Sequence, residues 1–269
     1  MRWRSVAATA ALAVGAVAMA FPFVWTVITS ITTGGTVLSS PHLIPEHPGL
    51  SGYRKLFDAL PVWRIVVNSL GLAVASTALL VTTSALAAYA FARFEFRGKN
   101  AVFVGYLATL MIPQQVLVVP LFIEMREFDL VDTYAGVLAP TIASAFGVFL
   151  LRQSIAVLPR ELDEAAFLDG AGHVRVFVQI VLPLIRPGLA TYGLLAFMSS
   201  WNSFLWPLVI IRSPEFMTLP LGIATLNGEY NVEWNAIMAG SVLSIVPMLL
   251  LYLVAQRHIV ESVAQAGLK

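Results

Sequence analysis

The side chains that could bind a polar ligand are few in the long apolar stretches of this sequence, and most of them are amides. Asn202 lies between Trp201 and Trp206, so an amide stands beside two aromatic faces, a combination that suits a sugar ring. Polar groups at membrane depth are costly unless they line a water-filled path or form hydrogen bonds between helices, and for each residue both roles stay open. The residues that we predict for a substrate path are Asn68, Gln114, Gln115, Trp201, Asn202 and Trp206.

Other kinds of chemistry find few candidate residues. The chain has no cysteine, which excludes disulfides, thiol nucleophiles and cysteine-ligated metal centres. The long apolar stretches contain no acid, lysine or arginine, so the paired acids or Ser/Lys dyad of an intramembrane enzyme are missing and a proton relay is disfavoured. We predict no catalytic residue and no metal site. An ion-coupled secondary carrier is the alternative class, but such carriers are normally built from internal repeats, and we find no convincing repeat.

The elements that must position these residues are membrane-spanning helices. The 269 residues are 58% hydrophobic and only 12% charged, about half the charge of a globular chain. The net charge of +1 is spread along the chain, which argues against a nucleic-acid partner. A span needs about 20 apolar residues. Charge-free windows therefore predict an all-α protein of six spans in one transmembrane domain over residues 1–269, at about 6–30, 65–92, 101–123, 133–151, 187–211 and 235–256.

The distribution of Lys and Arg predicts the orientation of these spans. The loops on the side of the two termini carry more Lys and Arg than the loops on the other side, so we expect both termini to be cytoplasmic. The first stretch could instead be a signal peptide, because Ala18-Met19-Ala20 resembles a cleavage site. Its apolar run from Val6 to Ile31 is longer than the core of a signal peptide, and we expect a retained helix.

One cytoplasmic loop, 152–186, is long enough to hold structure of its own. The positions of its proline and glycine residues predict two short helices, over 160–169 and 174–182. Pro159 suits a first helical position, Gly170 offers a stop, and Pro183 should break the second helix. Ala165 and Ala166 form a small, smooth patch beside Glu164. Such a patch fits the groove of another protein, or the helix lies flat on the membrane.

The spacing within this loop resembles the EAA loop of importer-type ABC transporter permeases. Glu164-Ala165-Ala166 is followed after three residues by Gly170, after nine more by Ile180, and then by Leu182-Pro183. Further segments resemble the second permease of carbohydrate importers such as the maltose system. They are Ala88-Tyr89-Ala90-Phe91-Ala92-Arg93, Met111-Ile112-Pro113, Asp132-Thr133-Tyr134, Phe149-Leu150-Leu151-Arg152-Gln153, Trp201-Asn202 and Leu205-Trp206-Pro207.

The resemblance implies the type I ABC importer permease fold, with a cytoplasmic coupling helix, in the cytoplasmic (inner) membrane of a bacterium. It implies a sister permease subunit, two ATPase subunits and an extracytoplasmic solute-binding protein as partners, besides the lipid bilayer. ATP and Mg²⁺ would bind the ATPases, because this chain lacks a phosphate-binding loop. We therefore expect that this chain is not itself an enzyme and binds no cofactor. The residues implied for ATPase coupling are Glu164, Ala165, Ala166, Asp169, Gly170, Ile180, Leu182 and Pro183.

The resemblance also implies a contact on the outer side. The segment Arg212 to Glu233 resembles the loop that reaches into the cleft of the binding protein in the maltose system, and its candidate contacts are Asn227, Gly228, Glu229 and Tyr230. The expected activity is ATP-driven, binding-protein-dependent import of a sugar or related polyol by alternating access. A non-sugar solute such as glycerol 3-phosphate is the alternative for the same family.

Overall fold

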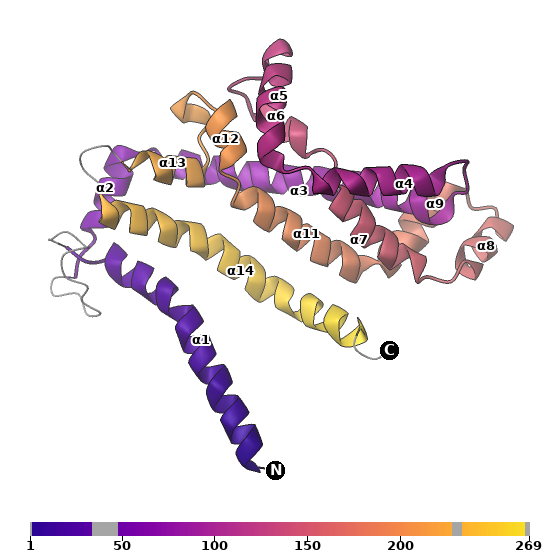
Figure 1. Cartoon of the computed structure of the whole chain (residues 1–269), viewed down its shortest axis with the longest axis horizontal. Helices are drawn as coiled ribbons and strands as arrows, with labels where there is room; N and C mark the ends of the chain where they lie inside the picture. The colour runs from indigo at the N-terminus through magenta and orange to yellow at the C-terminus, as the bar shows by residue number, and fades with distance from the viewer. Residues whose placement is uncertain (1, 34–47, 228–232, 267–269) are drawn as a thin grey trace. The chain divides into compact units, whose positions relative to one another are not determined.

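The computed structural model describes residues 2–33, 48–227 and 233–266, and this part of the chain is helical with short connections (Figure 1). Three helices run without interruption: α1 (Arg2–Ser30), α3 (Val62–Arg93) and α14 (Trp234–Ala266). Each contains a stretch long and apolar enough to cross a membrane. They correspond to the first, second and sixth predicted spans, and α1 begins before the apolar run that we identified.

The third predicted span is bent rather than straight. It consists of α4 (Lys99–Ala108), a 3-10 turn η1 (Thr109–Met111) and α5 (Gln114–Glu127), with a bend of 99° between the two parts. Pro113 explains the bend, because proline lacks an N–H and pushes the preceding residue out of the helical region. Ile112 is extended accordingly, at φ −85° and ψ 116°.

The fourth and fifth predicted spans are also interrupted. In the fourth, α6 (Tyr134–Leu138) and η2 (Ala139–Thr141) meet α7 (Ala145–Ala156) at 50°. In the fifth, α11 (Arg186–Trp201) has Asn202 as its C-cap, and α12 (Leu205–Ile210) starts after a short break. The segment His173–Leu184, which precedes α11, is bent by 79° relative to that helix. Counting each bent pair as one span, the described helices give up to six spans.

The chain forms two compact units. One unit comprises Met1–Val66 and Leu219–Met248 and contains α2 (Ser51–Ala59) and α13 (Leu219–Thr225) besides α1 and the start of α14. Its core includes Leu56, Val62, Ala236 and Ala239. Gly52 permits the close approach of α2 to α14, since a Cβ there would collide with the backbone carbonyl of Asn235.

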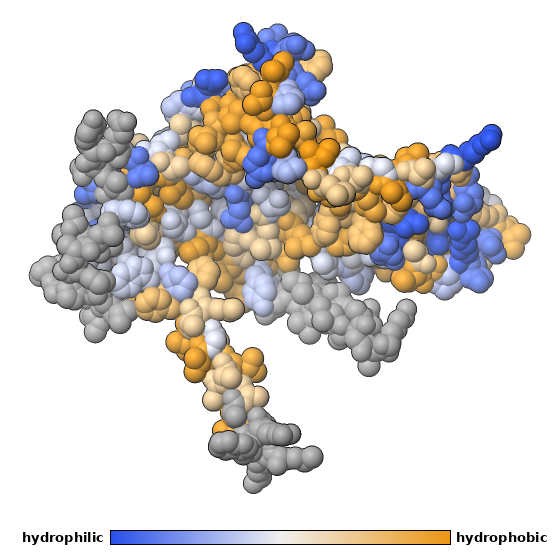
Figure 2. Space-filling model, viewed as in Figure 1, coloured by the Kyte–Doolittle hydropathy of each residue, from blue (hydrophilic) through white to orange (hydrophobic). Residues whose placement is uncertain are grey.

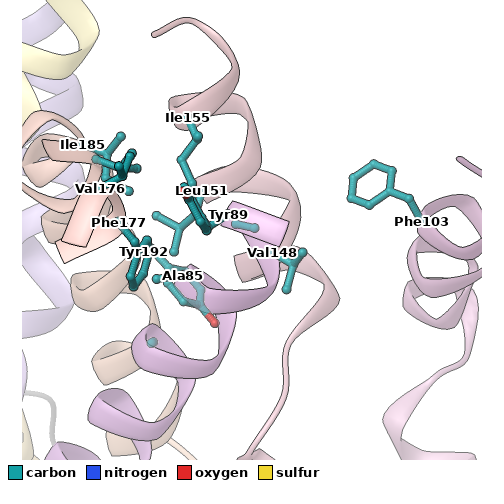
Figure 3. Packing of buried hydrophobic residues seen from close by; sticks show 13 residues of the cluster. Ala85, Tyr89, Phe103, Val148, Leu151, Ile155, Val176, Phe177, Ile185 and Tyr192 are labelled. Atoms are coloured by element: carbon teal, nitrogen blue, oxygen red, sulfur yellow. The ribbon is translucent and has the colours of Figure 1, made fainter. Parts of the chain in front are cut away.

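The second unit comprises Val67–Thr218 and Leu249–Lys269, and its core is built around α3, α7 and α11. Side chains from four parts of the chain converge there: Tyr89 from α3, Leu151 from α7, Phe177 from the segment that follows α8, and Tyr192 from α11 (Figure 3). Gly147 of α7 lies where a Cβ would overlap Tyr192 and Ser84. Large apolar side chains such as Val104 and Val116 are exposed on α4 and α5, as expected of surfaces in contact with lipid (Figure 2).

Candidate functional site

The predicted first helix of the loop is α8 (Glu161–Leu168). It begins two residues after Pro159, with Arg160 as the N-cap, so Pro159 does not occupy the first helical position. Glu161, Asp163 and Glu164 fall in the first turn, where the positive end of the helix dipole favours acidic side chains.

The turn after α8 is closed by backbone groups. Gly170 has φ +78°, a left-handed conformation that glycine adopts at little cost. The N–H of Gly170 donates to the carbonyl of Phe167 at 3.0 Å and that of Ala171 to the carbonyl of Ala166 at 2.9 Å, which is the Schellman motif. Asp169 contributes its N–H to the carbonyl of Ala165 at 3.1 Å.

The two faces of α8 differ sharply. Glu164 and Ala165 are exposed, and so is Leu168, whose exposed fraction is 90%. Ala166 is half-buried and packs against the core of the second unit. Asp163 is buried, and neither it nor Leu168 was among the predicted site residues. The three-residue spacing from Asp163 to the half-buried Ala166 places both residues on the inward face of α8.

The second helix of the loop continues through Pro183, contrary to the prediction. It consists of α9 (His173–Val176), a π-helical turn η3 (Phe177–Val181) and α10 (Leu182–Leu184). Pro183 falls in the first turn of α10, where its missing N–H is tolerated, and the bend comes later, at Ile185. Of the predicted coupling residues, Ile180, Leu182 and Pro183 are half-buried, and Leu182 packs against the core.

Charged side chains fix the surroundings of α8. Glu95 accepts hydrogen bonds from Lys99 at 3.0 Å and from Arg160 at 3.4 Å. These bonds lower the pKa of Glu95 below its usual value. Arg152 donates to the carbonyl of Phe91 at 3.4 Å, which links α7 to α3.

A cavity of about 280 Å³ lies among α3, α5, α6, α11 and α12. It brings together four of the predicted substrate-path residues, Gln114, Gln115, Trp201 and Trp206. None of its lining residues is charged. Hydroxyl groups that sequence reasoning did not assign to a substrate path make up much of the polar lining: Ser69, Ser76, Thr141, Ser199, Ser200, Ser203 and Thr218.

The other two predicted substrate-path residues do not line this cavity. The Asn68 amide donates to the carbonyls of Glu215 at 2.8 Å and Met217 at 3.1 Å, and its oxygen accepts from the Tyr134 hydroxyl at 2.7 Å. Asn202 is exposed and donates to the carbonyl of Met198 at 2.8 Å. Asn68 therefore forms hydrogen bonds between helices, the alternative role considered for it. The Asn202 bond instead stays within the last turn of α11.

The start of the outer segment is held by Asp132, which sequence reasoning missed. Its carboxylate accepts the backbone N–H of Arg212 at 2.8 Å and that of Ser213 at 2.9 Å, and also the Ser213 hydroxyl. Burial alone would raise the pKa of Asp132, but these hydrogen bonds outweigh it and hold the pKa below its usual value. Farther along the segment, Asn227 is exposed, whereas Gly228, Glu229 and Tyr230 lie outside the described residues.

Comparison with known proteins identifies relatives along most of the chain. Residues 80–265 match the family model described as binding-protein-dependent transport system inner membrane component. The arabinooligosaccharides transport system permease protein AraQ of Halalkalibacterium halodurans is 39% identical, over 77% of this chain and 74% of the relative. The diacetylchitobiose uptake system permease protein NgcG of Streptomyces coelicolor is 34% identical, over 91% and 82%.

The fold also matches that of a solved structure. A chain of a bacterial ABC transporter involved in the import of the acidic polysaccharide alginate aligns with a TM-score of 0.82 and 24% sequence identity, over 95% of this chain and 96% of that one. The bent helices, the short helix α8 and the family match lead to one conclusion. The chain belongs to the binding-protein-dependent transport system inner membrane component family and is a permease subunit of an ABC importer.

Proposed function

We propose that this permease imports an uncharged saccharide through the cavity among α3, α5, α6, α11 and α12. The observation that carries the proposal is the chemistry of the lining, in which hydroxyls and amides from Ser200 and Gln115 stand beside indole rings and no lining side chain is charged. Hydroxyls and amides both donate and accept hydrogen bonds, and an aromatic surface can pack on the apolar face of a sugar ring.

The same lining disfavours a phosphate ester. Several relatives carry that substrate in their names, including the sn-glycerol-3-phosphate transport system permease protein UgpE of Escherichia coli O157:H7, 33% identical over 98% of this chain and 97% of the relative. A phosphate dianion is usually bound by Arg or Lys, and the cavity offers neither. Relatives with arabinooligosaccharides and diacetylchitobiose in their names fit the lining better.

Transport measurements in the reconstituted importer test the substrate class. Uptake of labelled neutral oligosaccharides should be ATP-dependent, and sn-glycerol 3-phosphate should not compete. Gln115→Leu removes one hydrogen-bonding side chain from the lining, which corresponds to a loss of about threefold to tenfold in uptake. Gln153→Leu on α7, outside the cavity, is the matched control and should transport normally. Uptake of the phosphate ester, or equal loss in both variants, would contradict the proposal.

For energy supply we propose that α8 docks on an ATPase subunit. Leu168 and Ala165 present an apolar and a small side chain to solvent beside Glu164, and exposed apolar groups outside the membrane mark sites of protein contact. The importer would then contain two ATPases, which bind ATP and Mg²⁺, and a sister permease. A periplasmic solute-binding protein is supported by the solved alginate transporter in complex with its alginate pentasaccharide-bound periplasmic protein.

Docking can be measured by co-purification. Ala165→Arg introduces a large cation at the exposed surface of α8 and should reduce co-purification of the ATPase at least tenfold, because a buried unpaired charge costs several kcal/mol. Ala156→Arg is the control, since Ala156 is an exposed alanine at the end of α7 outside α8. Equal recovery of the ATPase with both variants would contradict docking through α8.

A further inference from the structure

A buried ion pair joins the end of α3 to the start of α8. Nε of Arg93 lies 2.6 Å from Oδ2 of Asp163, and the exposed fractions of the two side chains are 7% and 9%. Removing two charges from water is costly, and breaking such a pair leaves an uncompensated charge. The contact therefore resists separation far more than a surface salt bridge would.

The pair is favoured by the two helices that it joins. Arg93 is the last residue of α3, at the negative end of the helix dipole, and Asp163 lies in the first turn of α8, at the positive end. Arg93 also donates from Nη2 to the carbonyl of Leu158 at 3.2 Å. One guanidinium thus holds both α8 and the turn that leads into it.

Aromatic contacts fix the other end of α8 to the same region. The ring of His173 lies 4.9 Å from that of Phe167 on α8 and 4.9 Å from that of Phe94, and Phe94 in turn contacts Tyr89 of α3 at 5.6 Å. These centroid distances are typical of edge-to-face packing. The inward face of α8 is therefore attached at both ends to the end of α3.

The ion pair joins α8 to α3, a helix that also lines the cavity. Helix α3 is unbroken from Val62 to Arg93 and contributes Ser69, Leu72, Ser76 and Leu80 to the cavity lining. At 1.5 Å per residue, Ser76 lies about 26 Å from Arg93 along the same rigid helix. The route through the chain from α8 to α11 is interrupted by the π-helical turn and by the 79° bend, so it transmits displacement less directly.

We propose that the Arg93–Asp163 pair passes the movement of α8 to α3 and thereby to the cavity, with both residues acting as positioning residues. The inference rests on the proposed docking of α8 to an ATPase. Oδ1 of Asp163 is buried without a hydrogen-bond partner among the described residues. The ion pair to Arg93 is thus the contact that holds this carboxylate, and breaking it would leave a buried charge unpaired, so we expect α8 and α3 to move together.

The first test measures saccharide transported per ATP hydrolysed in the reconstituted importer. Asp163→Asn removes the charge while keeping the shape, and it should preserve co-purification of the ATPase and basal hydrolysis but lower the transport ratio about tenfold. Asp163→Glu keeps the charge and should restore most of the ratio. Arg93→Gln combined with Asp163→Asn should lose less than the product of the two single losses, because the residues act as one contact.

Three results would overturn the inference: a normal transport ratio for Asp163→Asn, independent effects of the two residues, or loss of ATPase binding. The last result would make the pair part of docking rather than of transmission. Failure of docking itself appears separately, as normal ATPase recovery with Ala165→Arg.

A second experiment does not depend on the stability of a single charged variant. The chain has no cysteine, so Arg93→Cys with Asp163→Cys introduces the only two thiols of this subunit. This double variant should be uncoupled until a short bifunctional thiosulfonate joins the thiols, and the covalent link should then raise the transport ratio severalfold. An unchanged ratio after complete linkage would overturn the inference.

Discussion

At the scale of single residues, Asp132 shows how one carboxylate organises a segment far away in the sequence. It accepts two backbone N–H groups and a hydroxyl from Arg212 and Ser213. Hydrogen bonds to a charged acceptor are about twice as strong as neutral ones. The segment after α12 is therefore held at its start by charge-assisted bonds, next to the region that contributes Thr218 to the cavity.

Because these bonds lower the pKa of Asp132, the attachment should depend on pH. A lowered pKa stabilises the folded form above the unfolded value of about 3.9, and the contribution is lost as the pH falls through the lower, folded value. Hydrogen-exchange protection of the Arg212 and Ser213 amides should thus be constant at neutral pH and decline below about pH 4. Asp132→Asn should lower protection at pH 7 and abolish the decline, and identical protection in both proteins would refute the assignment.

Gly147 makes a second prediction at this scale. A side chain there would overlap Tyr192 and Ser84, whereas a Cβ at Gly105 of α4 would meet no atom within 4 Å. Overpacking a core costs about 1–3 kcal/mol. Gly147→Leu should therefore lower the unfolding temperature in detergent, and Gly105→Leu should not. Equal unfolding temperatures for the two variants would show that the contact among α3, α7 and α11 is loose.

At the scale of elements, the start of α7 depends on one cap. Ser144 lies at the bend before α7, and its hydroxyl accepts the N–H of Gly147 at 3.1 Å. Loss of an N-cap side chain costs about 1 kcal/mol. Ser144→Ala should destabilise the protein by that amount and speed exchange of the Gly147 amide, whereas Ser144→Asn keeps an acceptor and should behave like wild type. Unchanged exchange in Ser144→Ala would argue against capping.

The helices show which part of the fold the sequence predicts. For α3 and α14 the predicted and observed starts differ by at most three residues, because uninterrupted apolar runs end at charges or turns. The bends at Pro113 and Ser144 and the break between α11 and α12 were missed, since a hydropathy window does not respond to an interruption within an apolar stretch. Pro113 was nevertheless a visible break signal.

The candidate site divides in the same way. The exposed Glu164 and Ala165 and the left-handed Gly170 follow from local spacing and turn chemistry. The inward orientation of Asp163 depends on Arg93, which lies in another helix, and composition alone places an acid in solvent. The assembly of Gln115 with Trp206 into one cavity likewise depends on tertiary packing of α5 against α12.

At the scale of the whole molecule, the prediction concerns orientation in the membrane. The excess of Lys and Arg predicts that the loop between α3 and α4 lies in the cytoplasm and that the loop after α5 lies outside. Phe96 is exposed in the first of these loops and Phe128 in the second, and the chain has no cysteine of its own. A membrane-impermeant maleimide should label Phe128→Cys in intact cells and Phe96→Cys only after permeabilisation. The opposite pattern would reverse the topology.

The π-helical turn at Phe177–Val181 has a geometric consequence for the orientation of α8. A π turn winds a surplus residue into the helix, and each residue of an α-helix advances the direction of its side chains by about 100°. That surplus residue sets the azimuth at which α9 leaves the core. Because the tight turn at Gly170 joins α8 to α9, the surplus residue also determines which side of α8 is exposed to solvent. Deleting one residue from the π-helical turn would therefore rotate α8 and change the direction in which the Ala165 side chain points, although the sequence of α8 would be unchanged.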